Sequence, residues 1–295
     1  MNEIGVIILT KNEELHIKRC VESLQNRFKI FVVDSGSTDN TKHFLNEMNI
    51  HWVEREWVSY SDQFNWAIAN FPFQVEWLFR LDADEYVDDA LKLQASVTEI
   101  GKSVSGLLIQ RHLRFQGRVI RYGGVNPMLH LRLWRAGTAR CESKWMDEHI
   151  VLNHGYIRQI GVNIVDDNRN GLDWWLSKHV GYALRESMDM VIIHFLGSQH
   201  EELKADAKVK RNFKTWYSKL PPYYRSFLYF AYRYFYRGGF RDGKIGLRFH
   251  LLQGLWYRLM VDSLVVEILS ESTSLNDAER YVMDKFGKDL LYYQR

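Results

Sequence analysis

The sequence predicts an α/β fold: a mostly parallel sheet with helices on both faces, followed by a helical extension at the C-terminal end. Over the first hundred residues, short apolar runs alternate with helix-like stretches, the pattern of βαβ units. In the last third, aromatic-rich helical patterns replace that alternation. At 295 residues, of which 46% are hydrophobic, the chain is long enough to bury a core.

The elements follow from the order of these runs. Strands are predicted at residues 4–9, 30–33, 51–54 and 77–81. The helices between and after them are predicted at residues 15–25, 38–46, 62–69 and 88–100. Further on, we expect strands with turns at 106–135, a helix at 171–187, and long helices over 201–270 with a break at Gly238 and Gly239. The predicted domains are residues 1–200, which contain the sheet, and residues 201–295, which are helical.

The charge of the chain is divided unevenly. Residues 204–258 hold thirteen Lys or Arg against two acids, together with sixteen aromatic residues, whereas the whole chain carries a net charge of only +3. This division indicates two parts with different partners. Cys20 and Cys141 are too few for a disulfide framework, the N-terminal apolar run is too short for a signal peptide, and no apolar stretch reaches about 18 residues. A cytoplasmic location is therefore expected.

Polar residues follow the first two predicted strands. The segment after the second strand, residues 34–39, has small residues between Asp34 and Asp39, whose carboxylates suit the N–H groups and hydroxyls of a nucleoside. The same segment is equally typical of a solvated turn in which Ser37 or Thr38 caps the next helix. The glycine-rich motifs of dinucleotide-binding enzymes and of P-loop NTPases are absent, which disfavours both classes.

A second acidic motif follows the fourth predicted strand. Asp82 and Asp84 point the same way at the tip of a buried strand, and two hard oxygen ligands suit a divalent cation that a diphosphate also binds. An isolated motif of this kind is usually a surface turn, but its place after the fourth strand favours a metal site. His149 is a candidate further ligand of the metal, with a buried structural histidine as the alternative.

Two more segments carry candidate chemistry. Asp147 and Glu148 are each suited to accept the proton of an acceptor hydroxyl, although a salt-bridged loop would contain the same residues. Lys178 and His179 lie in a helical pattern and would bring a cation, or a further metal ligand, to a diphosphate; a solvated helix face explains them equally well.

Three motifs, at residues 10–13, 34–39 and 82–85, together resemble glycosyltransferase family two, with its GT-A, Rossmann-like fold. The resemblance covers about the first 150 residues. Four further stretches resemble the branch of bacterial lipopolysaccharide-core β-1,4-glucosyltransferases and related exopolysaccharide enzymes: residues 63–67, 145–149, 178–183 and 238–247.

The resemblance implies a nucleotide-sugar donor, with glucose one candidate for the sugar, and Mg²⁺ or Mn²⁺ as cofactor. It implies that Glu13, Asp34 and Asp39 contact the nucleoside, and that Asp82 and Asp84 hold ribose, diphosphate and metal. The remaining donor-binding residues that it implies are Thr10, Asn12, Ser35, Gln63 and Lys178. Asp147 or Glu148 would be the general base of a single displacement with inversion, without a covalent nucleophile.

Other functions remain open alternatives. One is an inactive, glycosyltransferase-like binding protein, and another is a nucleotidyltransferase, although that class normally has a Gly-rich basic loop after the first strand. Glycoside hydrolysis, which also uses paired carboxylates, ranks last because it has no use for a nucleotide site. The expected acceptor is a lipid-linked or lipopolysaccharide-core glycan, reached at the inner face of the inner membrane, where the basic and aromatic region would dock peripherally. No nucleic acid is expected as a partner.

Overall fold

A computed structural model describes residues 3–98, 100–143, 145–146, 148–197 and 220–293. The chain separates into two compact units. The first comprises Met1–Arg121, Val125–Ser143 and Asp147–Asn170, and the second comprises Tyr122–Gly124, Lys144–Met146 and Gly171–Arg295. The division into domains at residue 200 stays a prediction.

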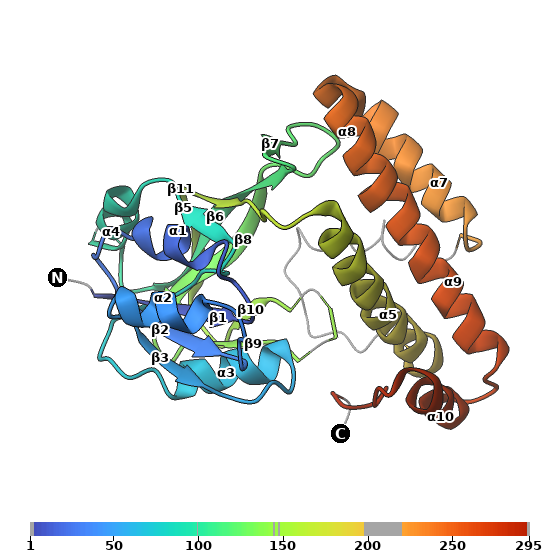
Figure 1. Ribbon diagram of the computed structural model, residues 1–295, viewed down its shortest axis with the longest axis horizontal. Coiled ribbons are helices and arrows are strands. Elements are labelled where there is room, and N and C mark those ends of the chain that lie inside the picture. The colour runs from blue at the N-terminus through green and yellow to red at the C-terminus, as the bar shows by residue number, and fades with distance from the viewer. Residues whose placement is uncertain (1–2, 99, 144, 147, 198–219, 294–295) are drawn as a thin grey trace. The chain divides into compact units, whose positions relative to one another are not determined.

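The first half of the sheet has the predicted βαβ pattern (Figure 1). Its parallel strands stand in the order β3-β2-β1-β4, with bounds β1 Ile4–Thr10, β2 Lys29–Asp34, β3 His51–Glu54 and β4 Trp77–Arg80. The connecting helices are α1 Ile17–Glu22, α2 Thr41–Glu47 and α3 Tyr60–Ala69. These elements confirm the α/β class. Because the strands are parallel, the polar residues that follow β1, β2 and β4 come to one edge of the sheet.

The second half of the sheet is mixed. Beyond β4 the order continues β8-β6-β11-β5, with bounds β8 Met128–Arg135, β6 Val104–Phe115, β11 Tyr156–Asp166 and β5 Glu85–Val87. Of these neighbours only β6 and β11 are parallel, so the parallel character belongs mainly to the first half. The smaller elements are α4 Ala90–Thr98, β7 Arg118–Val119, which pairs with β6, and the pair β9 Ala139–Cys141 and β10 Ile150–Leu152.

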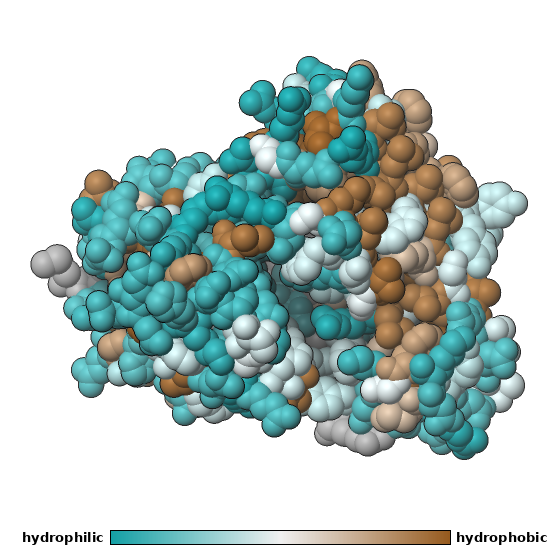
Figure 2. Space-filling view, viewed as in Figure 1, coloured by the Kyte–Doolittle hydropathy of each residue, from teal (hydrophilic) through white to brown (hydrophobic). Residues whose placement is uncertain are grey.

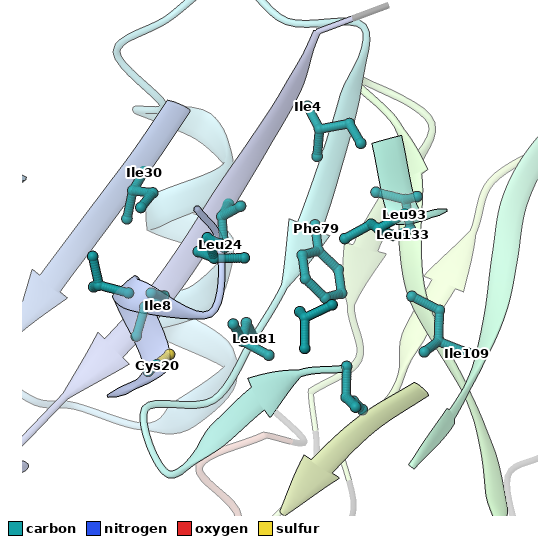
Figure 3. Packing of buried hydrophobic residues seen from close by; sticks show 14 of the residues in the cluster. Ile4, Ile8, Cys20, Leu24, Ile30, Phe79, Leu81, Leu93, Ile109 and Leu133 are labelled. Atoms are coloured by element: carbon teal, nitrogen blue, oxygen red, sulfur yellow. The ribbon is translucent and has the colours of Figure 1, made fainter. Parts of the chain in front are cut away.

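The core lies on both faces of the sheet, as predicted. Alternation along β1 sends Ile8 to one face and Ile7 to the other. On the first face, Ile8 belongs to the same cluster as Cys20 of α1 (Figure 3), and on the second, Ile7 clusters with Phe64 of α3. Truncating a buried residue such as Ile8 to Ala typically costs about 2–5 kcal/mol. The loops that carry the site therefore stand on a well-packed support.

The second unit is helical. Its helices are α5 Leu172–Leu196, α7 Tyr224–Ala231, α8 Gly243–Phe249, α9 Tyr257–Ser270 and α10 Leu275–Phe286, with π-helical segments η1 Tyr232–Tyr236 and η3 His250–Trp256 and a 3₁₀ turn η2 Gly239–Asp242. The predicted break is confirmed at Gly238, whose φ of 72° ends the preceding helix. The part of the 201–270 prediction at residues 201–219 lies outside the described residues. No described helix has the length and apolar character needed to cross a membrane.

Candidate active site

The loops after β1 and β2 are joined through the carboxylate of Asp34. Its Oδ2 accepts hydrogen bonds from Thr10 Oγ1 at 2.8 Å and Ser37 Oγ at 2.5 Å. Its Oδ1 accepts from the N–H groups of Gly36, at 3.0 Å, and Ser37, at 2.7 Å. Asp34 is fully buried, and all four acceptor positions of its carboxylate are in use. In this structure Asp34 shapes the loop, and its predicted contact with a nucleoside would require one of these donors to be exchanged.

The loop after β1 also folds onto the start of α2. Asn12 accepts a hydrogen bond from the N–H of Thr38 at 2.8 Å, and Glu13 donates its N–H to Thr41 Oγ1 at 2.7 Å. The carboxylate of Asp39 accepts from the N–H of Thr41 at 3.0 Å. The N-cap residue of α2 is Asn40, not Ser37 or Thr38, and its side chain makes no capping bond. Four of the predicted donor-binding residues, Asn12, Glu13, Asp34 and Asp39, thus meet at one edge of the sheet.

Gln63 brings α3 to the same edge. This buried side chain donates from Nε2 to Ser35 Oγ at 3.3 Å and to the carbonyl of Arg55 at 3.1 Å, and its Oε1 accepts from the Arg55 guanidinium. Ser35 and Gln63, both predicted in the donor site, therefore lie together. Their contact with a donor stays a prediction.

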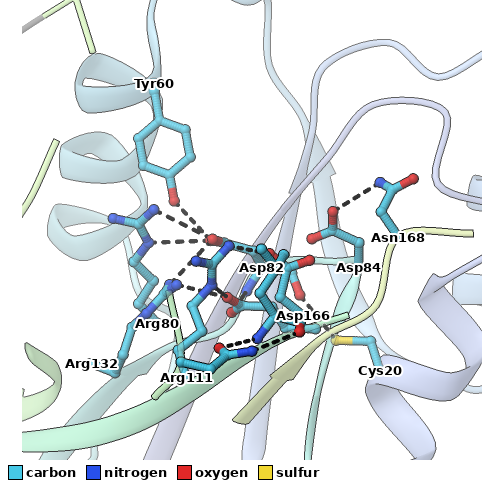
Figure 4. A network of polar contacts seen from close by, with 12 residues as sticks. Cys20, Tyr60, Arg80, Asp82, Asp84, Arg111, Arg132, Asp166 and Asn168 are labelled. Atoms are coloured by element: carbon cyan, nitrogen blue, oxygen red, sulfur yellow. Dashed lines mark hydrogen bonds and ion pairs between the residues drawn. The ribbon is translucent and has the colours of Figure 1, made fainter. Parts of the chain in front are cut away.

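The carboxylate of Asp82 is surrounded by cationic side chains (Figure 4). Its Oδ1 accepts from Tyr60 Oη at 3.0 Å and Arg80 Nε at 3.2 Å. Its Oδ2 accepts from Arg132 Nη1 at 3.2 Å and Arg80 Nη2 at 3.4 Å. Burial raises the pKa of Asp82, but Arg80 and Arg132 outweigh it and hold that pKa well below its ordinary value. Asp82 is therefore an anion already neutralised by the protein.

A second row of alternating charges lies next to Asp82. Buried Glu85 accepts from Arg111 Nε at 2.9 Å and Arg132 Nη2 at 2.7 Å, and Arg111 also pairs with Asp166. Burial, opposed by Arg111 and supported by the neighbouring carboxylates, raises the pKa of Asp166 to about 7. This network links β4, β5, β6, β8 and the end of β11, so it fixes the base of the acidic motif.

Sequence reasoning missed the three arginines of this network. Arg80, Arg111 and Arg132 lie on β4, β6 and β8. The one available sign was a basic residue inside an otherwise apolar run, because a buried cation needs a compensating anion nearby. Which anion it meets depends on pairing between strands that are far apart in the sequence.

Asp84 differs from Asp82. Its Oδ2 accepts from Asn168 Nδ2 at 2.9 Å, whereas its Oδ1 accepts no hydrogen bond from the residues that the structure describes. Figure 4 shows Asp84 turned away from the arginines, toward Asn168. The donor chemistry fits a divalent cation that takes one carboxylate oxygen from the protein and further oxygens from a diphosphate.

The predicted third ligand is not gathered with this pair. His149 is exposed and its Nδ1 lies 2.8 Å from Glu142 Oε1. Within the described ranges, no three His, Cys, Asp or Glu side chains come together as a ready-made metal site. His149 is also not the buried histidine of the alternative interpretation. Its role as a ligand stays a prediction that nothing in the described geometry favours.

Glu148, one of the two candidate bases, lies beside the acidic motif through its main chain. Arg80 donates from Nη1 to the carbonyl of Glu148 at 3.1 Å, while it also holds Asp82. Asp147 lies outside the described residues. One of the two candidates is thus brought near the motif, and the choice between them stays a prediction.

Lys178 belongs to the second unit, on α5. Its Nζ lies 4.4 Å from the centroid of the Trp174 ring, and the neighbouring His179 stacks on Trp175 with ring centroids 3.5 Å apart. These contacts give both side chains a place within the helical unit. Contact of Lys178 with a diphosphate stays a prediction.

Residues 5–160 of the chain match Glycosyl transferase family 2. The chain belongs to this family. The matched range contains the loops after β1, β2 and β4, the three arginines of the network and the two candidate bases, whereas Asp166 lies beyond it. Family 2 membership therefore confirms the resemblance drawn from the motifs at residues 10–13, 34–39 and 82–85.

Among curated proteins, this family 2 chain is similar to the lipopolysaccharide core biosynthesis glycosyltransferase LpsC of Rhizobium meliloti. The two are 30% identical over 155 residues, which cover 50% of this chain and 57% of LpsC. It is also similar to an uncharacterized glycosyltransferase of Rickettsia typhi, with 32% identity over 93 residues, or 31% of each protein. The chain thus spans less than two thirds of the length of these relatives.

Among solved structures, the chain is similar to S. aureus TarS in complex with UDP-GlcNAc, with a TM-score of 0.46 and 16% identity over 99% of this chain and 91% of that one. It is also similar to glucosyl-3-phosphoglycerate synthase from Mycobacterium tuberculosis in complex with Mn²⁺, UDP and glucosyl-3-phosphoglycerate. Here the TM-score is 0.33 and the identity 19%, over 38% of this chain and 44% of that one.

Proposed function

We propose that this protein is an inverting, metal-assisted glycosyltransferase that moves a sugar from a nucleoside diphosphate sugar to an acceptor hydroxyl. The observation that carries the proposal is the contrast within the acidic motif. Asp82 is neutralised by Arg80 and Arg132, while Asp84 keeps one carboxylate oxygen without a hydrogen bond from any described residue. The protein has thus left one hard oxygen ligand available at the edge of the sheet where its nucleoside-binding candidates meet.

In this proposal Asp84 holds Mg²⁺ or Mn²⁺ together with the diphosphate of the donor. A cation held there would supply positive charge to offset the negative charge of the leaving diphosphate. Asp82, held by Tyr60, Arg80 and Arg132, keeps its carboxylate in one orientation, and its contact with the donor would require one of these four hydrogen bonds to be exchanged. Gln63 of α3 also faces the nucleoside, together with the loop residues Asn12, Glu13, Ser35 and Asp39, and the Asp34 network fixes the backbone of these loops.

The transfer itself is a single displacement. The acceptor oxygen forms a bond to the anomeric carbon on the face opposite the diphosphate, the bond to the diphosphate breaks with its electron pair leaving on that group, and the acceptor proton passes to Asp147 or Glu148. A positioned carboxylate is suited to take this proton. The hydrogen bond from Arg80 to the carbonyl of Glu148 supports this role, because it keeps Glu148 beside the acidic motif.

The test is a thermal-shift screen of nucleoside diphosphates with and without Mn²⁺, followed by assays of donor hydrolysis. A ligand that binds only the folded state stabilises it, by about 2.7 kcal/mol when its concentration is 100 times its Kd, and so raises the melting temperature. We expect one nucleoside diphosphate to stabilise the protein strongly only with Mn²⁺, and slow hydrolysis of the matching sugar donor. Binding without any hydrolysis or transfer would favour the inactive binding protein, and release of pyrophosphate from a nucleoside triphosphate would favour a nucleotidyltransferase.

The proposed acceptor is a lipopolysaccharide-core or other lipid-linked glycan, with glucose one candidate for the sugar. The support is the similarity to LpsC over 155 residues. Such an acceptor would be met at the cytoplasmic face of the inner membrane, and the second unit offers a surface for that location.

The docking surface, as we name it, consists of exposed residues of η1, η2, α8 and η3. Its apolar members are Phe235, Tyr236, Phe240, Leu247 and Leu251, and its basic members are Arg237, Arg241, Lys244 and Arg248. Tyr236 is 81% exposed and Phe235 62%. Figure 2 shows apolar residues gathered along the helix that runs from α8 to α9. Exposed aromatic groups beside cations are suited to the interface of an anionic bilayer.

The charge of this surface supports the same partner. Between residues 221 and 251 the only acid is Asp242, which is half-buried and accepts the backbone N–H of Tyr122 at 2.9 Å. Each Lys or Arg near an anionic leaflet contributes about 1 kcal/mol. The exposed cations are therefore not opposed by an exposed carboxylate of the same segment, and we propose peripheral association with the inner membrane.

A further inference from the structure

Asn168 stands where β11 ends, next to the acidic motif. Its Nδ2 donates to Asp84 Oδ2 at 2.9 Å (Figure 4). No motif in the sequence singled out this residue. The contact joins two segments that lie 84 positions apart in the chain.

The orientation of the Asn168 amide is set by a second hydrogen bond. Its Oδ1 accepts the backbone N–H of Asn170 at 3.0 Å. Because a backbone N–H can only donate, the oxygen of the amide must face Asn170, which turns the NH₂ group toward Asp84. The donor to Asp84 is thus held in place by the backbone.

The main chain at Asp84 is held from the same side. The carbonyl of Asp84 accepts from Arg19 Nη2 at 3.1 Å and from the N–H of Asp167 at 3.2 Å. Arg19 also donates to the Asp167 carboxylate at 2.5 Å and to its carbonyl at 2.7 Å. Backbone and side chain of Asp84 are therefore both tied to the turn at residues 167–168, which leaves Oδ1 as the oxygen that can take a new partner.

We propose that Asn168 is a positioning residue for the cation: it occupies Oδ2 of Asp84 and so presents Oδ1 as a single ligand in a fixed direction. This inference rests on the proposed metal-assisted function. Residues that hydrogen-bond to a metal ligand orient that ligand and raise the affinity for the metal. Their loss typically weakens metal binding about 10- to 100-fold.

The test is the affinity for Mn²⁺ in the presence of UDP, measured from the electron paramagnetic resonance signal of free Mn²⁺. We expect Asn168→Ala and Asn168→Leu, the second of which keeps the volume, to bind Mn²⁺ about 10- to 100-fold more weakly than wild type. The matched control is Asn163→Ala. Asn163 lies on β11 itself and, like Asn168, donates from Nδ2 to a carboxylate, that of Asp88 at 2.7 Å, so its variant should bind Mn²⁺ as wild type does.

A kinetic measurement separates positioning from a general loss of structure. In Asn168→Ala, saturating Mn²⁺ should restore transfer to within a few-fold of wild type, because Asp84 is still present, whereas Asp84→Ala should not recover. Equal Mn²⁺ affinity in wild type, Asn168→Ala and Asn168→Leu would overturn the inference and leave the proposed function standing. Absence of Mn²⁺ binding by the wild type would overturn the metal-assisted function, and the inference with it.

Discussion

Arg80 donates hydrogen bonds to both carboxylate oxygens of Asp82, which lies two residues further along the chain. Its Nε is 3.2 Å from Oδ1 and its Nη2 is 3.4 Å from Oδ2. The same guanidinium donates to the carbonyl of Glu148. One side chain thus connects the acidic motif after β4 with the segment that contains the candidate bases. Loss of Arg80 should disturb both at once.

Asp84→Ala should be folded and inactive. The variant removes the one hard oxygen that the motif leaves available, so the stabilisation by UDP with Mn²⁺ should disappear while the melting temperature without ligands stays near that of wild type. The measurement is the ligand-induced shift, together with transfer in EDTA-treated, Mn²⁺-replenished buffer. Asp88→Ala is the control, since Asp88 is exposed and also has an asparagine partner. Full activity of Asp84→Ala in that buffer would rule out the metal role.

Between the two candidate bases we favour Asp147. Asp147→Asn should lose about 10²- to 10⁴-fold in transfer, the usual contribution of a positioned general base, while binding of the donor stays near normal. Glu148→Gln is the matched variant, and we expect it to lose much less. Wild-type transfer by Asp147→Asn combined with an inactive Glu148→Gln would reverse the assignment.

Asp166 should make stability depend on pH. Its pKa is about 7 in the folded protein and about 3.9 in the unfolded chain. Because the folded state binds this proton more tightly, protonation stabilises the fold. That stabilisation is complete below about pH 4 and is lost as the pH rises through 7. Asp166→Asn has no such titration. The free energy of unfolding of wild type, relative to this variant, should therefore fall between pH 4 and 7, by at most about 4 kcal/mol. Urea unfolding across this range measures the difference, and parallel curves would contradict it.

The docking surface should bind anionic vesicles. Flotation with liposomes of increasing anionic content should recover more protein, and high salt should release it, because screened charges attract weakly. The variants that test this binding must reverse cations that are exposed. Arg233 is a poor choice, since it is buried and donates to the carbonyl of Gly123 at 3.2 Å.

Two sets of variants therefore test the surface. The first changes Arg237, Lys244 and Arg248 to Glu, and the second changes Phe235 and Tyr236 to Ser. Each set should abolish flotation. The controls reverse the exposed Lys102, Arg118 and Arg158 of the first unit, or change its exposed Tyr156 to Ser, and should float as wild type does. Absence of flotation under every condition, with full activity on a soluble acceptor, would remove the membrane proposal.

The sequence predicted the elements whose cause is local. Apolar runs and their spacing placed β1 to β4 and the helices after them, and polar residues at strand ends located Asp34, Asp39, Asp82 and Asp84. The features that the sequence did not predict depend on contacts between residues far apart in the chain. β11 was not predicted, and so neither was Asn168, which becomes significant only because β11 ends beside the turn that precedes β5. The burial of Arg233 also has no local sign in the sequence, because it donates to the carbonyl of Gly123, 110 positions away.

Above about pH 7, where Asp166 is ionised, three carboxylates and three guanidiniums balance in the network that joins Asp82, Glu85 and Asp166 to Arg80, Arg111 and Arg132. Asp84 stands outside that balance with one negative charge. A divalent cation arriving alone would leave an excess of positive charge there, and a diphosphate arriving alone would be repelled by Asp84. Each therefore lowers the free energy of binding of the other. By thermodynamic reciprocity the cooperativity is the same whichever ligand is varied. Under the proposed function, the protein would therefore select the metal–nucleotide complex rather than either component.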